Sequence, residues 1–336
     1  MDQSHLYPLR FEPIYQYRLW GGHRLAKLLG APLMDDGPIG EAWVLSDRDD
    51  HESVVTDGPF QGQTIGQLIK RSPEQMFGKH SSHFKRFPLL LKFLDAKEML
   101  SVQVHPSDAQ TNYLPAGESG KTEAWVVLEA GSEGRADVGA VPGTTQEILQ
   151  QAIASGTIAD HLAGFTPKPG DGIFLPAGTV HSFGDLVVFE VEENSDVTFR
   201  FYDWDRVDPK TGKPRPLQVD QAMACVDLTQ GSVGPVTPII EETEPVLREK
   251  LFSCKQFGLW RKSGSAAFTV GVEGTPRVLV CLAGDGELEH GGAEYSFNKG
   301  DVLLLPAVVG ACLCRPHGAV TLLEISLPEG VPNITT

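Results

Sequence analysis

The chain repeats one pattern, which reads PKPGDGIFLPAGTVHSFG at residues 167–184 and FNKGDVLLLPAVVGACLC at residues 297–314. Each copy contains Gly-Asp, then three or four apolar residues, and then turns at Pro-Ala. Short apolar runs bounded by glycine and proline are typical of β-strands joined by tight turns. The repeat therefore predicts two similar β units. Five residues after its proline the first copy has His181, whereas the second has Ala311. We expect only the first unit to keep a polar ligand at this corner.

The rest of the 336-residue chain fits a mainly β protein with a few interspersed helices. It is rich in turn residues, with 36 glycines and 24 prolines. Helical spacing occurs at residues 64–78, 144–162 and 216–228, with Thr64 and either Thr144 or Thr145 as N-caps. The stretch 231–244 is rich in Pro, Thr and Glu and is typical of a linker. We expect a first domain over residues 1–235, with helical insertions, and a second over 236–336.

Composition excludes several classes of function. The net charge of −16 disfavours nucleic acids and anionic membranes as partners. The first residues lack the basic and apolar regions of a secretory signal, and no apolar run approaches the length of a membrane span. The five cysteines, an odd number, include no C-x-x-C pair and are expected to be free thiols. We therefore expect a soluble cytoplasmic protein.

A second motif suggests a metal site. SVQVHP, residues 101–106, has the alternation of a strand, so Gln103 and His105 point to the same face. Glu123 lies near the start of the apolar strand KTEAWVVLEA, residues 121–130, and His181 opens the strand after the Pro-Ala-Gly turn. Two imidazoles, a carboxylate and an amide oxygen form a reasonable ligand set for zinc. Each residue alone is more often a surface amide, a solvated charge or a core histidine, and the contact between these distant segments is a hypothesis.

Four segments together resemble the class I mannose-6-phosphate isomerases (phosphomannose isomerases) of the short bacterial form. They are FPLLLKFLDAKEMLSVQVHPSD, GKTEAWVVL, KPGDGIFLPAGTVHSFG and NSDVTFRFYDWDR. The resemblance covers residues 10–220 in ordered blocks, while residues 235–336 resemble the degenerate second cupin domain of that family more loosely. It implies two cupin-type jelly-roll units and a zinc-dependent aldose–ketose isomerase. Such an enzyme interconverts mannose 6-phosphate and fructose 6-phosphate through a cis-enediol(ate).

The resemblance also implies roles for individual residues. One zinc ion per chain would be held by Gln103, His105, Glu123 and His181. Catalytic roles would fall to Arg200, Lys121 and Asp196. The substrate pocket would be lined by Glu41, Lys92, Lys121, Phe183 and Arg200. Two positions depart from the family pattern: Gly120 replaces a histidine that longer members carry before the lysine, and Phe183 replaces a tyrosine found in some members.

The catalytic assignments leave alternatives open. Arg200 would stabilise the developing oxyanion, but it could also form a structural salt bridge with Asp196 or Asp203 and face solvent. Lys121 is a candidate base or proton shuttle, with zinc-bound solvent, Glu41 and Asp196 as alternatives. Candidates for binding the phosphate are Lys92, Lys97 and Lys121, of which we expect Lys97 to be solvated.

Two other functions compete with the isomerase. The chain could be another metal-dependent cupin enzyme, such as an iron oxygenase, although a glutamine ligand and the N-S-D-x-x-x-R motif disfavour this. It could also be a non-catalytic sugar-binding or regulatory cupin, although a complete ligand set with Lys121 and Arg200 disfavours that. As partners we expect a small sugar phosphate, no nucleic acid, no membrane, and a monomer or weak homo-oligomer.

Overall fold

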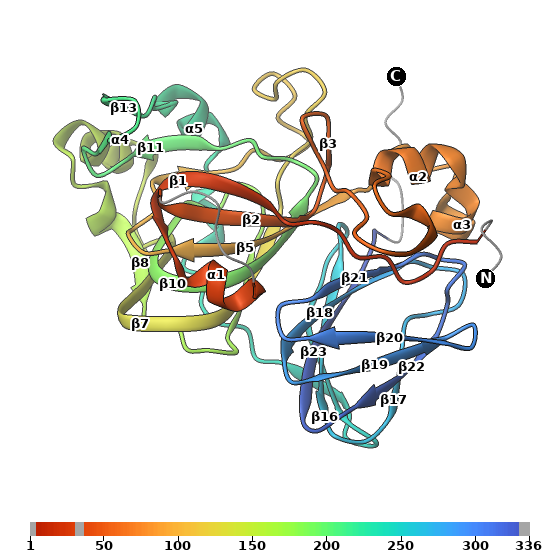
Figure 1. Cartoon of the computed structure of the whole chain (residues 1–336). Helices are drawn as coiled ribbons and strands as arrows, with labels where there is room; N and C mark the ends of the chain where they lie inside the picture. Colours follow the sequence, from red (N-terminus) through yellow and green to blue (C-terminus); the bar gives the residue numbers. More distant parts are fainter. Residues whose placement is uncertain (1–4, 31–36, 329–336) are drawn as a thin grey trace.

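A computed structural model describes residues 5–30 and 37–328. Its first part is a nine-stranded antiparallel sheet. Figure 1 shows that this sheet is curled. The strands are β1 (Ile14–Gly22), β2 (Ile39–Leu45), β5 (Leu89–Ala96), β6 (Val102–Val104), β7 (Glu123–Ala140), β8 (Leu162–Phe165), β9 (Gly172–Leu175), β10 (His181–Glu193) and β11 (Phe199–Tyr202). Two short hairpins stand outside it, β3 (Asp47–Arg48) with β4 (His51–Glu52) and β12 (Val207–Asp208) with β13 (Lys213–Pro214).

The second part packs a six-stranded sheet against a four-stranded one. The larger sheet contains β14 (Ile239–Glu242), β15 (Leu247–Ser253), β16 (Gly258–Gly264), β18 (Arg277–Ala283), β21 (Val302–Leu305) and β23 (Val320–Ser326). The smaller contains β17 (Phe268–Val270), β19 (Asp285–His290), β20 (Ala293–Asn298) and β22 (Cys312–Pro316). The expected mainly β fold of two cupin-type units with a few helices is confirmed.

The sequence repeat corresponds to a structural repeat. Asp171 and Asp301 each accept a backbone N–H three residues upstream, from Lys168 at 2.8 Å and from Asn298 at 2.9 Å. The preceding glycines, Gly170 and Gly300, both have φ of +93°, a left-handed conformation that glycine adopts without strain. The Gly-Asp motif therefore builds the same turn twice, and each turn leads into a buried strand, β9 or β21.

The helices α2 (Ile65–Arg71), α4 (Gln146–Ser155) and α5 (Val219–Cys225) confirm the three helical predictions, with shorter bounds. Thr64 caps α2 through a capping box, and Thr145, not Thr144, caps α4. The helix predicted over 144–162 ends early because Gly156 adopts the left-handed conformation that terminates helices. A separate helix, α3 (Pro73–Phe77), follows α2, and the sequence did not predict α1 (Arg24–Leu29).

The predicted linker 231–244 is only partly irregular, because Ile239–Glu242 form β14 at the edge of the six-stranded sheet. The residues of β14 show no apolar–polar alternation, and in the structure both Ile239 and Ile240 are exposed. The N-terminal segment also crosses between the two parts: Leu9 pairs with Leu304 of β21 through two backbone hydrogen bonds. Within the described residues, no helix is long and apolar enough to cross a membrane.

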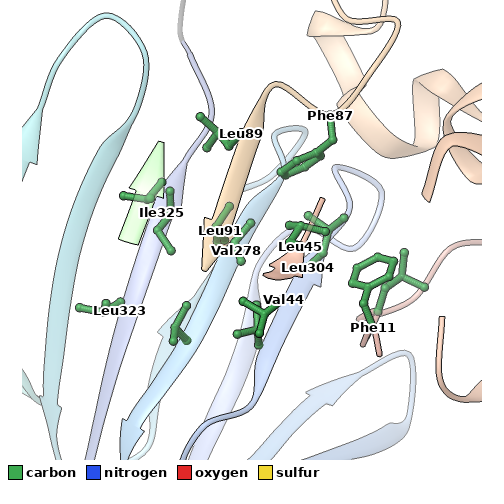
Figure 2. Packing of buried hydrophobic residues seen from close by; sticks show 14 of the residues in the cluster. Phe11, Val44, Leu45, Phe87, Leu89, Leu91, Val278, Leu304, Leu323 and Ile325 are labelled. Carbon is green, nitrogen blue, oxygen red and sulfur yellow. The ribbon is translucent and has the colours of Figure 1, made fainter. Parts of the chain in front are cut away.

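One hydrophobic cluster joins the two units. It combines Val44, Leu45, Phe87 and Leu91 from the first part with Val278, Leu304, Leu323 and Ile325 from the second, and Figure 2 shows these side chains packed together. All of these side chains are buried. The two units therefore share a core, and the faces of β2 and β5 away from this core are available to line a site.

Candidate metal centre and active site

Three neighbouring strands, β10, β6 and β11, bring functional side chains into one row. The strand β6 lies between β10 and β11, where His181 is paired with Gln103 and Gln103 is paired with Arg200. Directly paired residues of antiparallel strands have Cβ atoms about 5 Å apart and project to the same face. The register of these strands therefore brings an imidazole, an amide and a guanidinium together, although they are far apart in sequence.

His105, Glu123 and His181 form a compact cluster of candidate metal ligands. The Nε2 atom of His105 lies 3.3 Å from Oε2 of Glu123, and Nε2 of His181 lies 3.4 Å from Oε1. All three candidate ligand atoms are within 4.8 Å of one another, and the side chains are buried. The structure thus brings together three of the four predicted ligand residues.

The hydrogen bonds of both histidines favour metal binding. Nδ1 of His105 donates to the carbonyl of Val197 at 2.7 Å, and Nδ1 of His181 donates to the carbonyl of Thr179 at 2.9 Å. A neutral ring that donates from Nδ1 carries its lone pair on Nε2, the atom facing Glu123. Burial lowers the pKa of His181 to about 4, which keeps this imidazole neutral near pH 7.

The carboxylate of Glu123 completes this donor set. Burial raises its pKa, but Lys121 and the two histidines outweigh burial and hold the pKa well below its usual range. Its Oε1 atom is buried without a hydrogen-bond partner among the described residues. A divalent cation would satisfy this oxygen, and two imidazole nitrogens with one carboxylate are typical zinc ligands. The residues present therefore fit a metal such as zinc.

Gln103, the fourth predicted ligand, lies against the cluster. Its Nε2 is 3.2 Å from Nε2 of His181, and its Oε1 accepts a hydrogen bond from Ser101 at 2.9 Å. The amide oxygen and nitrogen are distinguished only by their hydrogen bonds. Rotating the amide by 180° would direct Oε1 into the cluster and let Nε2 donate to Ser101, so the side chain can reach the metal position.

An open cavity of about 320 Å³ lies beside the cluster. The predicted site residues that line it are Glu41, Lys92, Gln103, Lys121, Phe183, Asp196 and Arg200. Sequence reasoning missed several others, among them Tyr17, Arg18, Glu190, Thr198, Asp208 and Arg215. Lys97, a candidate for binding the phosphate, lies on an exposed bend and does not line this cavity.

Glu192, also missed, links the two predicted lysines. Its carboxylate lies 2.7 Å from Nζ of Lys92 and 2.6 Å from Nζ of Lys121. Burial lowers the pKa of Lys121, but Glu123 and Glu192 outweigh burial and raise the pKa well above its ordinary value. Lys121 is therefore an ammonium in this arrangement. The signal in the sequence was the alternation VFEVEE at residues 188–193, where acidic residues interrupt an apolar strand.

Asp196 and Glu41 share a second ion-pair network at the cavity wall. Asp196 lies 3.0 Å from Nζ of Lys92, and Arg18 forms a bidentate pair with Glu41 through contacts of 2.8 and 3.0 Å. Burial raises the pKa of Asp196, but Lys92 and Arg18 outweigh it and hold the pKa below its usual range. Both carboxylates are therefore ionised, and Arg18 and Lys92 are engaged by them.

Arg200 differs from these cations because it has no ion pair among the described residues. Asp203, its suggested salt-bridge partner, instead binds Arg206 and Arg215 at 2.6 and 2.5 Å. The Nε atom of Arg200 is buried and finds no hydrogen-bond partner in the described part of the chain. Burial, with Arg215 adding to it, lowers the pKa of Arg200 to about 10. The structural salt bridge of Arg200 with Asp196 or Asp203 is therefore not observed among residues 5–30 and 37–328.

Comparisons of this chain with family models and with curated proteins both find mannose-6-phosphate isomerases. A family model described as phosphomannose isomerase type I, catalytic domain, matches residues 9–122. Mannose-6-phosphate isomerase ManA of Bacillus subtilis is 35% identical over 307 residues, which are 90% of this chain and 94% of that protein. Mannose-6-phosphate isomerase of Streptococcus mutans is 36% identical, over 90% of this chain and 93% of that protein.

Solved structures agree with these sequence matches. The crystal structure of mannose 6-phosphate isomerase from Bacillus subtilis superposes with a TM-score of 0.87 and 27% identity, covering 96% of this chain and all of that one. A putative mannosephosphate isomerase from Archaeoglobus fulgidus gives a TM-score of 0.77 at 21% identity, over 96% of this chain and 99% of that one. At that identity the second match supports the fold alone.

Proposed function

Because the chain belongs to the mannose-6-phosphate isomerases of the phosphomannose isomerase type I family, we propose that it interconverts mannose 6-phosphate and fructose 6-phosphate with one zinc ion. His105, Glu123 and His181 would hold the metal, with Gln103 as the fourth ligand. The observation that carries this proposal is the pair of buried Nε2 lone pairs, of His105 and His181, that face the Glu123 carboxylate. Among the described residues, Oε1 of that carboxylate has no hydrogen-bond partner. A bound zinc would supply Lewis-acid stabilisation of negative charge on the sugar oxygens at C1 and C2.

The reaction requires a proton to leave C2 of the open-chain aldose and to arrive at C1. The C2 hydroxyl proton is transferred to O1, so the aldehyde becomes a hydroxymethyl group and C2 becomes a ketone. We propose that Arg200 stabilises the oxyanion of the enediolate, because it lines the cavity and has no ion-pair partner among the residues described. Lys121, an ammonium in this arrangement, would give a proton to O1, take the C2 proton as a neutral amine, deliver it to C1 and regain the O2 proton. The ionised Asp196 and Glu41 would accept hydrogen bonds from sugar hydroxyls.

The phosphate needs a further cation. Arg215 lines the same cavity and lies close enough to Arg200 to depress its pKa. Lys92 and Lys121 are less suitable, because each is already paired with two or more buried carboxylates. We propose that the phosphate binds at Arg215, beside Arg200 in this cavity.

We further propose a division of labour between the two units. Residues 1–235 would form the catalytic domain. Residues 236–336 would form a degenerate cupin that supports it, since the interior between their two sheets is an apolar cluster that includes Phe268, Leu288 and Phe297. The shared core would make this support part of the stability of the catalytic unit.

The test is conversion of mannose 6-phosphate to fructose 6-phosphate by the full chain before chelation, after chelation and after zinc is restored. We expect activity to be lost and then regained, and His181→Ala to stay inactive in excess zinc. Folded, zinc-loaded protein without isomerase activity would refute the proposal and favour a sugar-binding cupin. Recovery with iron and oxygen dependence would instead favour another cupin enzyme.

A further inference from the structure

One turn controls the geometry of both histidine ligands. The carbonyl of Thr179 accepts the Nδ1–H of His181 at 2.9 Å, and the backbone N–H of Gly178 donates to the carbonyl of His105 at 2.9 Å. Gly178 has φ of +90°, and a Cβ there would come within 3.0 Å of Cβ of Asp227. A shift of this turn, Pro176–Thr179, would therefore move the His181 ring and the His105 backbone together.

A segment from elsewhere in the chain, residues 227–230, forms hydrogen bonds with this turn. Nε2 of Gln230 donates to the carbonyl of Ala177 at 3.0 Å, while its Oε1 is in short contact with the hydroxyl of Thr179. That hydroxyl, which has one proton to donate, also lies 2.7 Å from the carbonyl oxygen of Pro176. The backbone N–H of Asp227 donates to the carbonyl of Gly178 at 2.9 Å. The amide of Gln230 therefore contacts the turn on both sides of Gly178.

Residues 227–230 are held by hydrogen bonds of their own. Residues 228–230 form a single 3-10 turn, η4 (Leu228–Gln230), capped by Asp227, whose carboxylate accepts the backbone N–H of Thr229 at 2.9 Å. The same carboxylate lies 3.3 Å from Nε2 of Gln230. The capped 3-10 turn thus holds the Gln230 amide against the turn at residues 176–179. These local hydrogen bonds reduce the side-chain entropy that is lost when the amide is held in place.

We infer that Gln230 is a positioning residue for the metal centre. It fixes the carbonyl of Thr179, which in turn sets the tautomer and the ring orientation of His181. Groups behind a ligating histidine orient the ring, and their loss typically weakens metal binding about 10- to 100-fold. Because Gln230 acts one hydrogen bond farther out, the low end of that range applies. The inference rests on the metal site proposed above and adds a residue that none of the recognised motifs contains.

The test measures zinc affinity of the full chain by competition with a chromogenic chelator. We expect Gln230→Ala and Thr179→Val to weaken zinc binding by roughly 10-fold, and Thr179→Ser, which keeps the hydroxyl, to retain wild-type affinity. The matched control is Gln75→Ala, which removes a glutamine of α3 that accepts the backbone N–H of Leu6 at 2.9 Å and belongs neither to the ligand cluster nor to the cavity lining. That control should bind zinc as the wild type does.

Two further readouts separate positioning from a general loss of structure. In saturating zinc, Gln230→Ala should have the kcat of the wild type. Only the zinc concentration that gives half-maximal activity should be higher than for the wild type. In chelator, its melting temperature should fall no further than that of Gln75→Ala. If Gln230→Ala binds zinc with the affinity of the wild type, the inference about Gln230 is overturned, but the proposed metal site is not. A wild-type chain that binds no divalent metal would overturn both the inference and the metal site.

Discussion

Replacing Arg200 by methionine should make the protein more stable and far less active. The guanidinium is buried beside Arg215, and these surroundings lower its pKa to about 10. Since one pKa unit corresponds to about 1.4 kcal/mol, the depression represents a cost to the charged form of the order of 3 kcal/mol. Methionine has similar length and no charge, so we expect the free energy of unfolding to rise by about 1–3 kcal/mol. The same loss should lower kcat by roughly 100- to 1,000-fold, as for removal of an oxyanion donor.

The assay combines thermal unfolding, zinc affinity and isomerase kinetics on Arg200→Met and on Arg315→Met as a control. Arg315 lies on β22, in the second unit, and pairs with Glu289 at an exposed site. We expect the control to match the wild type in kcat and Arg200→Met to bind zinc normally. A variant with near-wild-type kcat would refute the oxyanion role. A variant with lower stability would refute the claim that Arg200 is an unsatisfied cation in the substrate-free chain.

Three further perturbations test other parts of the account. Burial raises the pKa of Glu193 to about 7, so the folded chain retains a proton that the unfolded chain releases above about pH 4.3. Stability should therefore fall as pH rises from about 4.3 to 7 and stay level above, and Glu193→Gln, which still accepts the N–H of Thr122, should raise the melting temperature at about pH 8 but not at about pH 4. An equal effect at both pH values would contradict this. Arg215→Ala should raise KM for mannose 6-phosphate more than it lowers kcat. An unchanged KM would contradict the proposal that the phosphate binds at Arg215. Phe87→Ala should cost about 3–5 kcal/mol of unfolding free energy in a single transition by calorimetry, whereas two separate transitions would mean that the units do not share a core.

Local patterns were sufficient to predict the parts of the site that are fixed by local geometry. Strand alternation put Gln103 and His105 on one face, and the Pro-Ala-Gly turn put His181 at the start of β10. The cap at Thr64 followed from hydrogen bonds within four residues. In each case the physical cause lies within one turn or one strand, so it can be read from neighbouring residues.

Long-range pairings could not be predicted in the same way. The pairing of Arg200 with Gln103 depends on the register of β11 against β6, which no local signal specifies. Whether a charged residue is free or engaged depends on partners from distant strands, as with Glu192 between Lys92 and Lys121. The linker prediction failed at β14 for a related reason, because an exposed edge strand needs no apolar alternation.

The two copies of the repeat show that the turn and the corner form whether or not a candidate metal ligand follows them. The turns at Asp171 and Asp301 make the same side-chain hydrogen bond, and each following proline, Pro176 or Pro306, accepts a backbone N–H three residues later, at 3.1 and 2.9 Å. Only the first copy places a histidine after this corner. The corner therefore forms from glycine, aspartate and proline without any ligand. The proposed metal binding would then be a function added to a rigid support, and residues that hold the support, as we infer for Gln230, would influence the metal without touching it.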